Sequence, residues 1–166
     1  LYVEQKSLEL TVDLRHPAFI LSVEINQQGV FMFTETIECF GGVPTGIEGA
    51  VALLLDNEIS VLAGLLAMKR GCILFPVSVG GNIISLSLLQ QFSPVTLTSL
   101  SFPDFSSFES WMTNKNIPFL VNGQTILNYI SKQTTVSQLR PLVAYTLAAI
   151  NAQLSEYHRA VNSQSI

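Results

Sequence analysis

The stretch that decides the fold is residues 50–79, AVALLLDNEISVLAGLLAMKRGCILFPVSV. It opens with an apolar run of strand length at 50–55 and closes with a second one at 72–79. Between them, residues 60–70 have the pattern of an amphipathic helix, and Gly71 supplies a typical helix end. The stretch therefore predicts a strand, a helix and a second strand, which is the repeating unit of a parallel sheet.

The same alternation continues to the end of the chain. Further strands are predicted at 95–102, 117–121 and 138–142. Further helices are predicted at 84–92, 106–115, 125–132 and 145–161. Five strands alternating with five helices predict an α/β fold, a doubly wound five-stranded parallel sheet covered by helices on both faces.

A different pattern precedes this sheet. Residues 8–14 alternate between apolar and polar side chains like a half-buried strand, and residues 19–25 and 30–37 form two further runs. The last two runs are joined by Asn26-Gln27-Gln28-Gly29, which favours a hairpin. Four glycines and one proline then fall within residues 41–49. We therefore expect a small β unit at 1–40, a linker at 41–49 and the α/β domain at 50–166.

The composition of the chain indicates which binding partners to expect. Hydrophobic residues make up 48% and charged residues 12% of the chain, which predicts a folded core, and 8 Lys plus Arg against 12 Asp plus Glu give a net charge of −4. Because phosphate contacts dominate nucleic-acid affinity, RNA binding is expected to be weak, with Lys69, Arg70 and Arg140 as its candidate residues. The apolar runs are far shorter than the ~20 residues of a membrane span and no signal peptide is seen, so a cytoplasmic protein without membrane contact is expected. Cys39 and Cys72 predict neither a disulfide framework nor a metal site.

Six short motifs, in the right order, resemble the tRNA 4-thiouridine synthetases, a family of tRNA sulfurtransferases also assigned to thiamine-thiazole sulfur transfer. The motifs are the hairpin at 23–36, Gly41-Gly42-Val43-Pro44-Thr45-Gly46, Val51-Ala52-Leu53-Leu54-Leu55, Met68-Lys69-Arg70-Gly71, Leu120-Val121-Asn122-Gly123 and Leu139-Arg140-Pro141-Leu142. The resemblance implies an RNA-binding THUMP unit, here shortened to residues 1–40, followed by a PP-loop ATP pyrophosphatase domain.

The chain departs from that family at the loop that holds ATP. The family's Ser-Gly-Gly-x-Asp-Ser wraps the phosphates with backbone N–H groups, whereas this chain has Asp56-Asn57-Glu58-Ile59-Ser60. Both glycines are absent, the loop is one residue shorter, and only Ser60 matches. Since carboxylates stand where an anion would bind, we expect ATP binding and adenylation to be lost. A structural interpretation is that Asp56, Asn57 and Glu58 cap the following helix.

Ligands of open parallel sheets bind beyond the carboxyl ends of the strands. The remaining nucleotide pocket should therefore be lined by Asp56, Asn57, Glu58, Ser60, Gly80, Gly81, Asn122, Gly123 and Gln124. No catalytic residue is assigned, because neither cysteine aligns with the family's catalytic cysteine. No cofactor is expected either.

Three hypotheses for function remain open. The first is an accessory or binding protein in tRNA thiolation or sulfur transfer. The second is an active nucleotide-binding enzyme of the same fold. The third is a structural homo-oligomer, for which we expect a homodimer through residues 8–37, with one apolar face formed by Leu10, Val12, Leu21, Val23, Phe31 and Phe33.

Overall fold

The computed structural model describes residues 13–36, 41–81, 83–128 and 135–163. The chain divides into two units, Leu1–Cys39 and Phe40–Ile166.

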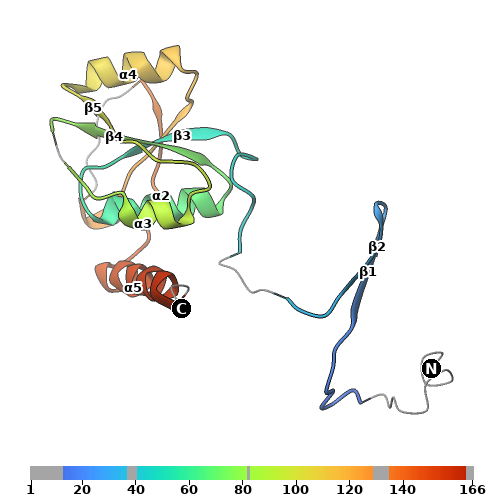
Figure 1. The fold of residues 1–166 in the computed structure, drawn as a ribbon. Helices are drawn as coiled ribbons and strands as arrows, with labels where there is room; N and C mark the ends of the chain where they lie inside the picture. The colour runs from blue at the N-terminus through green and yellow to red at the C-terminus, as the bar shows by residue number, and fades with distance from the viewer. Residues whose placement is uncertain (1–12, 37–40, 82, 129–134, 164–166) are drawn as a thin grey trace. The chain divides into compact units, whose positions relative to one another are not determined.

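The larger unit is built on a five-stranded parallel sheet, as the sequence predicts (Figure 1). The strand order is β5-β4-β3-β6-β7, so the chain adds β4 and β5 on one side of β3 and then β6 and β7 on the other. The strands are β3 (Ala50–Leu54), β4 (Ile73–Val79), β5 (Leu100–Phe102), β6 (Phe119–Val121) and β7 (Ser137–Leu139). The order of the strands therefore reverses between β3 and β6.

Helices cover both faces of this sheet. Helices α2 (Ile59–Lys69), α3 (Ser87–Phe92) and α5 (Leu147–Ser163) contribute to the core on one face, and α4 (Phe105–Asn114) packs on the other (Figure 1). Strand β3 contributes side chains to the cores on both faces of the sheet, because successive side chains point to opposite faces. Leu53 belongs to the core under α2, whereas Leu54 belongs to the core under α4.

Several predicted elements are shorter in the structure, and two of them depart most from the prediction. The predicted strand at 95–102 is wrong in its first half, because the side chain of Gln90 accepts from the Leu97 amide at 2.7 Å and donates to the Val95 carbonyl at 3.1 Å. The predicted helix at 125–132 begins only as the 3-10 turn η1 (Ile126–Asn128), and residues 129–134 lie outside the described residues.

Residues 41–49 pack on the end of α2. The Val43 amide donates to the Lys69 carbonyl at 3.0 Å, and the Gly46 amide donates to the Gly71 carbonyl at 2.7 Å. Gly42 has a φ of +110°, and a β-carbon there would overlap the Lys69 carbonyl oxygen, so only glycine fits. The structure therefore places these residues within the unit Phe40–Ile166 and not in a free linker.

The smaller unit contains an antiparallel hairpin of β1 (Ser22–Asn26) and β2 (Gly29–Phe33). Its register pairs Val23 with Met32 and Glu24 with Phe31, so Val23 and Phe31 lie on opposite faces. The expectation of one apolar face shared by Leu21, Val23, Phe31 and Phe33 is therefore wrong. Most of the predicted strand at 8–14, including Leu10 and Val12, lies outside the described residues.

In the part of the chain that the structure describes, no helix has the length and apolar character needed to cross a membrane.

Candidate functional site

The candidate site lies where the loops that follow β3 and β6 meet. The two strands are adjacent and parallel, so their carboxyl ends open at the same edge of the sheet, at the point where the strand order reverses. A β-carbon at Gly123 would lie 2.8 Å from the backbone nitrogen of Ser60 and 2.9 Å from its α-carbon. The structure thus brings together two of the loops that the sequence assigns to the nucleotide pocket, and Gly123 permits their close approach.

The N-terminus of α2 is closed by its own side chains. The Asn57 side-chain oxygen accepts from the Ser60 amide at 3.1 Å, and the Asn57 carbonyl accepts from the same amide at 3.1 Å. The Ser60 hydroxyl, which is fully buried, donates to Asp56 Oδ1 at 2.6 Å. The Val61 amide donates to the Glu58 carbonyl at 3.2 Å. Two of the N–H groups at the start of α2, those of Ser60 and Val61, are therefore occupied within the chain.

The capping interpretation holds for Asn57 but not for Glu58. Glu58 stands at the cap position of α2 and makes no side-chain capping hydrogen bond. It lines a separate cavity of about 280 Å³ together with Ser85, Ser87 and His158.

A second group of polar side chains, the polar cluster, extends the site along β6 and β7. Its members are Asn122, Gln124, Gln138 and Arg140. Asn122 and Gln124 are 1% and 7% exposed, respectively. The side-chain nitrogen of Asn122 donates to Gln138 Oε1 at 3.0 Å, and Arg140 donates to Gln138 at 2.6 Å and to Gln124 at 3.0 Å. Gln138 is not singled out by sequence reasoning, since a lone glutamine in a short strand carries no signal until the neighbouring strand is known.

Gly80 and Gly81 are not drawn into these contacts. Their φ angles are +79° and +88°, and a β-carbon at either position would meet nothing within 4 Å. They form the turn after β4, where the Gly80 amide donates to the Phe102 carbonyl at 3.1 Å. Their role is conformational, because side chains rarely adopt this backbone region.

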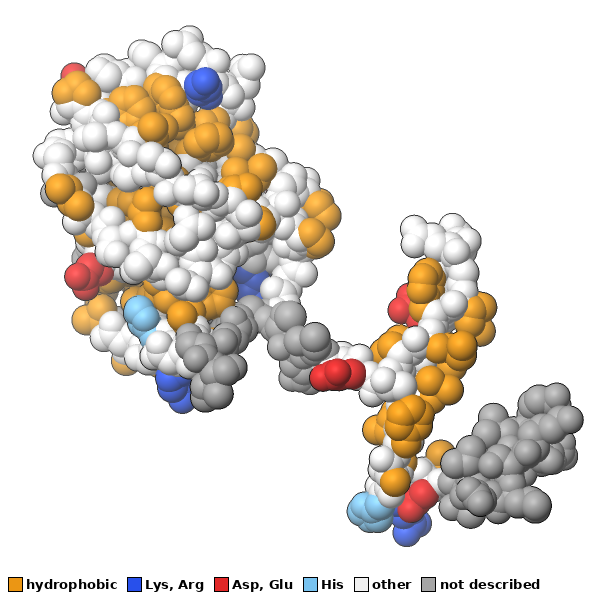
Figure 2. Space-filling view, viewed as in Figure 1, with side chains coloured by type: hydrophobic (Ala, Val, Ile, Leu, Met, Phe, Trp, Pro, Cys, Tyr) orange, Lys and Arg blue, Asp and Glu red, His pale blue; other side chains and the backbone are white. Residues whose placement is uncertain are grey.

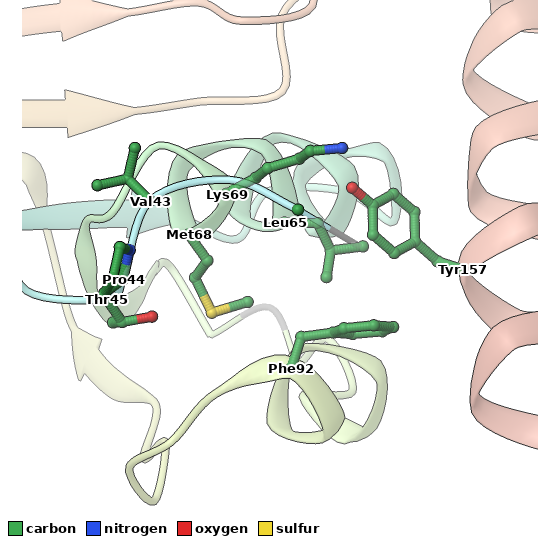
Figure 3. Close-up of a pocket in the computed structure, with 9 residues that line it drawn as sticks. Val43, Pro44, Thr45, Leu65, Met68, Lys69, Phe92 and Tyr157 are labelled. Carbon is green, nitrogen blue, oxygen red and sulfur yellow. The ribbon is translucent and has the colours of Figure 1, made fainter. Parts of the chain in front are cut away.

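A small cavity of about 180 Å³ lies beside the other end of α2, against the loop of residues 43–45. Figure 3 shows Met68 pointing between that loop and Phe92. Phe92 meets Tyr157 of α5 edge to face at 5.2 Å between ring centroids, and burial together with the charge of Glu156 raises the pKa of the Tyr157 hydroxyl. The cavity is mostly apolar, and Lys69 and Tyr157 are among the polar residues that line it (Figure 3).

Similarity to known proteins agrees with the architecture. No protein-family model matches the chain. The probable tRNA sulfurtransferase of Thermotoga maritima is 46% identical over 71 residues, which are 42% of this chain and 18% of that protein. The probable tRNA sulfurtransferase of Methanocaldococcus jannaschii is 40% identical over 68 residues, or 40% of this chain and 18% of that protein. This chain is a relative of the tRNA sulfurtransferases. It spans less than a fifth of the length of these curated relatives.

Two solved structures share the fold, and one of them is a 4-thiouridine synthetase. A 4-thiouridine synthetase–RNA complex with bound ATP aligns with a TM-score of 0.61 and 25% identity over 93% of this chain and 52% of that one. PH1313 from Pyrococcus horikoshii aligns with a TM-score of 0.69 and 24% identity over 88% of this chain and 53% of that one. The predicted family and the predicted fold are therefore confirmed.

Proposed function

We propose that this tRNA sulfurtransferase relative does not adenylate tRNA and acts as an accessory or binding protein in tRNA thiolation or sulfur transfer. The observation that supports the proposal is the closed N-terminus of α2. There the Ser60 amide is bonded to Asn57 and the Ser60 hydroxyl to Asp56.

Two costs oppose phosphate binding at this end of α2. The Asn57 side chain would have to leave the Ser60 amide, which loses a helix cap of about 1 kcal/mol. The Asp56 carboxylate would then face the incoming anion. Two unit charges ~5 Å apart at a protein surface repel by about 3 kcal/mol. Glycines would let the backbone approach a phosphate closely, but the loop from Asp56 to Ser60 contains none.

The adenylation step itself is the test. The chain is incubated with tRNA, ATP and Mg²⁺, and released pyrophosphate is measured, with a full-length tRNA sulfurtransferase as the positive control. We expect release no faster than without protein. tRNA-dependent release above that background would contradict the proposal and would favour the alternative of an active nucleotide-binding enzyme.

A second proposal concerns assembly and is supported by the hairpin. Both of its faces carry exposed apolar side chains, which Figure 2 shows along the strands. Val23, Ile25 and Met32 are 53%, 77% and 70% exposed on one face, and Phe31 and Phe33 are 47% and 39% exposed on the other. An isolated two-stranded hairpin is marginal in water, so we propose that it packs against its copy in a homodimer.

Multi-angle light scattering at micromolar concentration tests this assembly. The expected mass is twice the 18.2 kDa of the chain. Phe31→Asp combined with Phe33→Asp should restore the monomer. Leu127→Asp, which alters a side chain 88% exposed in the other unit, should leave the dimer intact. A monomeric wild-type chain would refute the dimer.

A further inference from the structure

The cavity with the most distinctive chemistry lies beside the C-terminal end of α2, between that helix, β6, β7 and α5. Its volume is about 820 Å³, within the range of small-molecule sites. The lining of the cavity includes an apolar wall of Leu66, Val121 and Leu139, together with Tyr145. A wall of this kind can hold a flat ring.

Positively charged side chains line this cavity, although the chain as a whole has a net negative charge. Lys69, Arg70 and Arg140 all line it, and none of the described lining residues is acidic. Hydrogen bonds from Arg140 to Gln124 and Gln138 hold its guanidinium in place. The three residues predicted from the sequence as RNA-binding candidates thus line one cavity, where their positive charges favour the binding of an anion.

Hydrogen bonds to the last carbonyls of α2 weaken its opposition to that anion, since the C-terminus of a helix is its negative pole. The loop after the hairpin covers the Lys69 carbonyl, which accepts from the Val43 amide at 3.0 Å. The Leu66 carbonyl accepts from the Arg70 amide at 3.2 Å, and the Ala67 carbonyl accepts from the Cys72 amide at 3.1 Å. These carbonyls are therefore occupied within the protein.

One polar group at the cavity lacks a partner. The side-chain oxygen of Gln153, on α5, is covered by other atoms and accepts no hydrogen bond in the described structure, so a ligand donor reaches it when the side chain turns toward the cavity. A buried acceptor without a donor costs free energy, and a ligand that supplies the donor recovers it. This second observation is independent of the cations.

We propose that this cavity binds an organic phosphate whose ring carries a hydrogen-bond donor, which is the chemistry of a nucleoside monophosphate. Lys69, Arg70 and Arg140 hold the phosphate at the rim, the ring lies against Tyr145 and the apolar wall, and a ring amino group donates to Gln153. The site lies at the opposite end of α2 from the closed N-terminus, so it does not rest on the proposed function.

Isothermal titration calorimetry with 5′-AMP tests the site. We expect saturable binding at least about tenfold tighter than for adenosine or inorganic phosphate, because each of those lacks one half of the ligand. Lys69→Gln and Arg70→Gln should each weaken AMP binding about tenfold, the effect of losing one charge-assisted contact. Arg159→Gln removes the same charge from an exposed position that does not line this cavity and should change nothing.

Gln153→Leu separates a binding role from a structural one. It removes the unpaired acceptor at similar volume, so the empty protein should become more stable while AMP binding weakens. AMP should also slow alkylation of Cys72, which lines the cavity, in a Cys39→Ser background. The proposal would be overturned if titration with millimolar AMP released or absorbed no heat. It would also be overturned if Arg159→Gln and Arg70→Gln weakened AMP binding equally. A 5′-phosphorylated trinucleotide then distinguishes the end of an RNA from a free nucleotide as the source of the ligand.

Discussion

Replacing Gly123 by alanine probes the contact on which the candidate site depends. The added β-carbon would lie 2.8 Å from the Ser60 nitrogen, 2.9 Å from its α-carbon and 3.0 Å from its hydroxyl oxygen. Two of these atoms are backbone at the start of α2, so they cannot move without shifting the helix. Gly123 has no positive φ, so the penalty is steric and not conformational.

Gly64→Ala is the matched control. Its β-carbon would lie 2.6 Å and 2.9 Å from the terminal methyl groups of Leu53 and Leu89, which can turn aside. Overpacking costs about 1–3 kcal/mol, and alanine returns roughly 1 kcal/mol in helix propensity inside α2. We therefore expect Gly123→Ala to cost about 2–3 kcal/mol and Gly64→Ala about 0–2 kcal/mol.

Urea unfolding followed by circular dichroism measures both costs. The m-value should stay unchanged, which shows that the variants differ in stability and not in the surface exposed. A Gly123→Ala protein as stable as wild type, or less affected than Gly64→Ala, would refute the close approach of the two loops.

Further outcomes follow from charge and burial. In filter binding, we expect weak tRNA capture that is lost at modest salt, because the net charge is −4; tight capture at physiological salt would contradict this. Asp104 accepts from the Ser107 amide at 2.8 Å, which lowers the pKa of Asp104. The helix cap therefore stabilises the protein fully at neutral pH, and this stabilisation is lost as the pH falls through the lowered pKa. Asp104→Ala should lower the urea midpoint at pH 7 but much less at pH 2. Asp104→Asn should keep most of the cap. Burial, and secondarily Glu48, raises the pKa of the Cys72 thiol, so iodoacetamide should alkylate it more slowly than a free cysteine at pH 8, and equal rates would contradict its burial.

The core of the larger unit could be predicted because β3 and most of β4 are buried on both faces. The sequence has continuous apolar runs at β3 and β4, separated by a helix that ends at Gly71. This order is typical of two parallel strands joined by a helix. The first half of the predicted strand at 95–102 failed because the side chain of Gln90 takes the backbone groups that pairing would need. A hydrogen bond from a single side chain to the nearby backbone leaves no periodic trace in the sequence.

The site could be predicted only in part, for a related reason. Placing Asp56 and Asn122 at the carboxyl edge follows from the alternation of strands and helices. That β3 lies beside β6, so that Gly123 meets Ser60, depends on the strand order, which short strands do not reveal. The cavity at Gln153 depends on where α5 packs, and no local pattern specifies that contact.

The most direct test of the closed α2 N-terminus is a titration of ¹⁵N-labelled protein with Mg²⁺ and ATP, followed by amide chemical shifts. The Ser60 and Val61 amides report on the N-terminus of α2, because they are the N–H groups that the preceding loop now occupies. We predict that both signals stay unshifted at millimolar ATP, even if amides near Arg70 move through the separate cavity. Saturable shifts of Ser60 and Val61 at micromolar ATP would contradict the account.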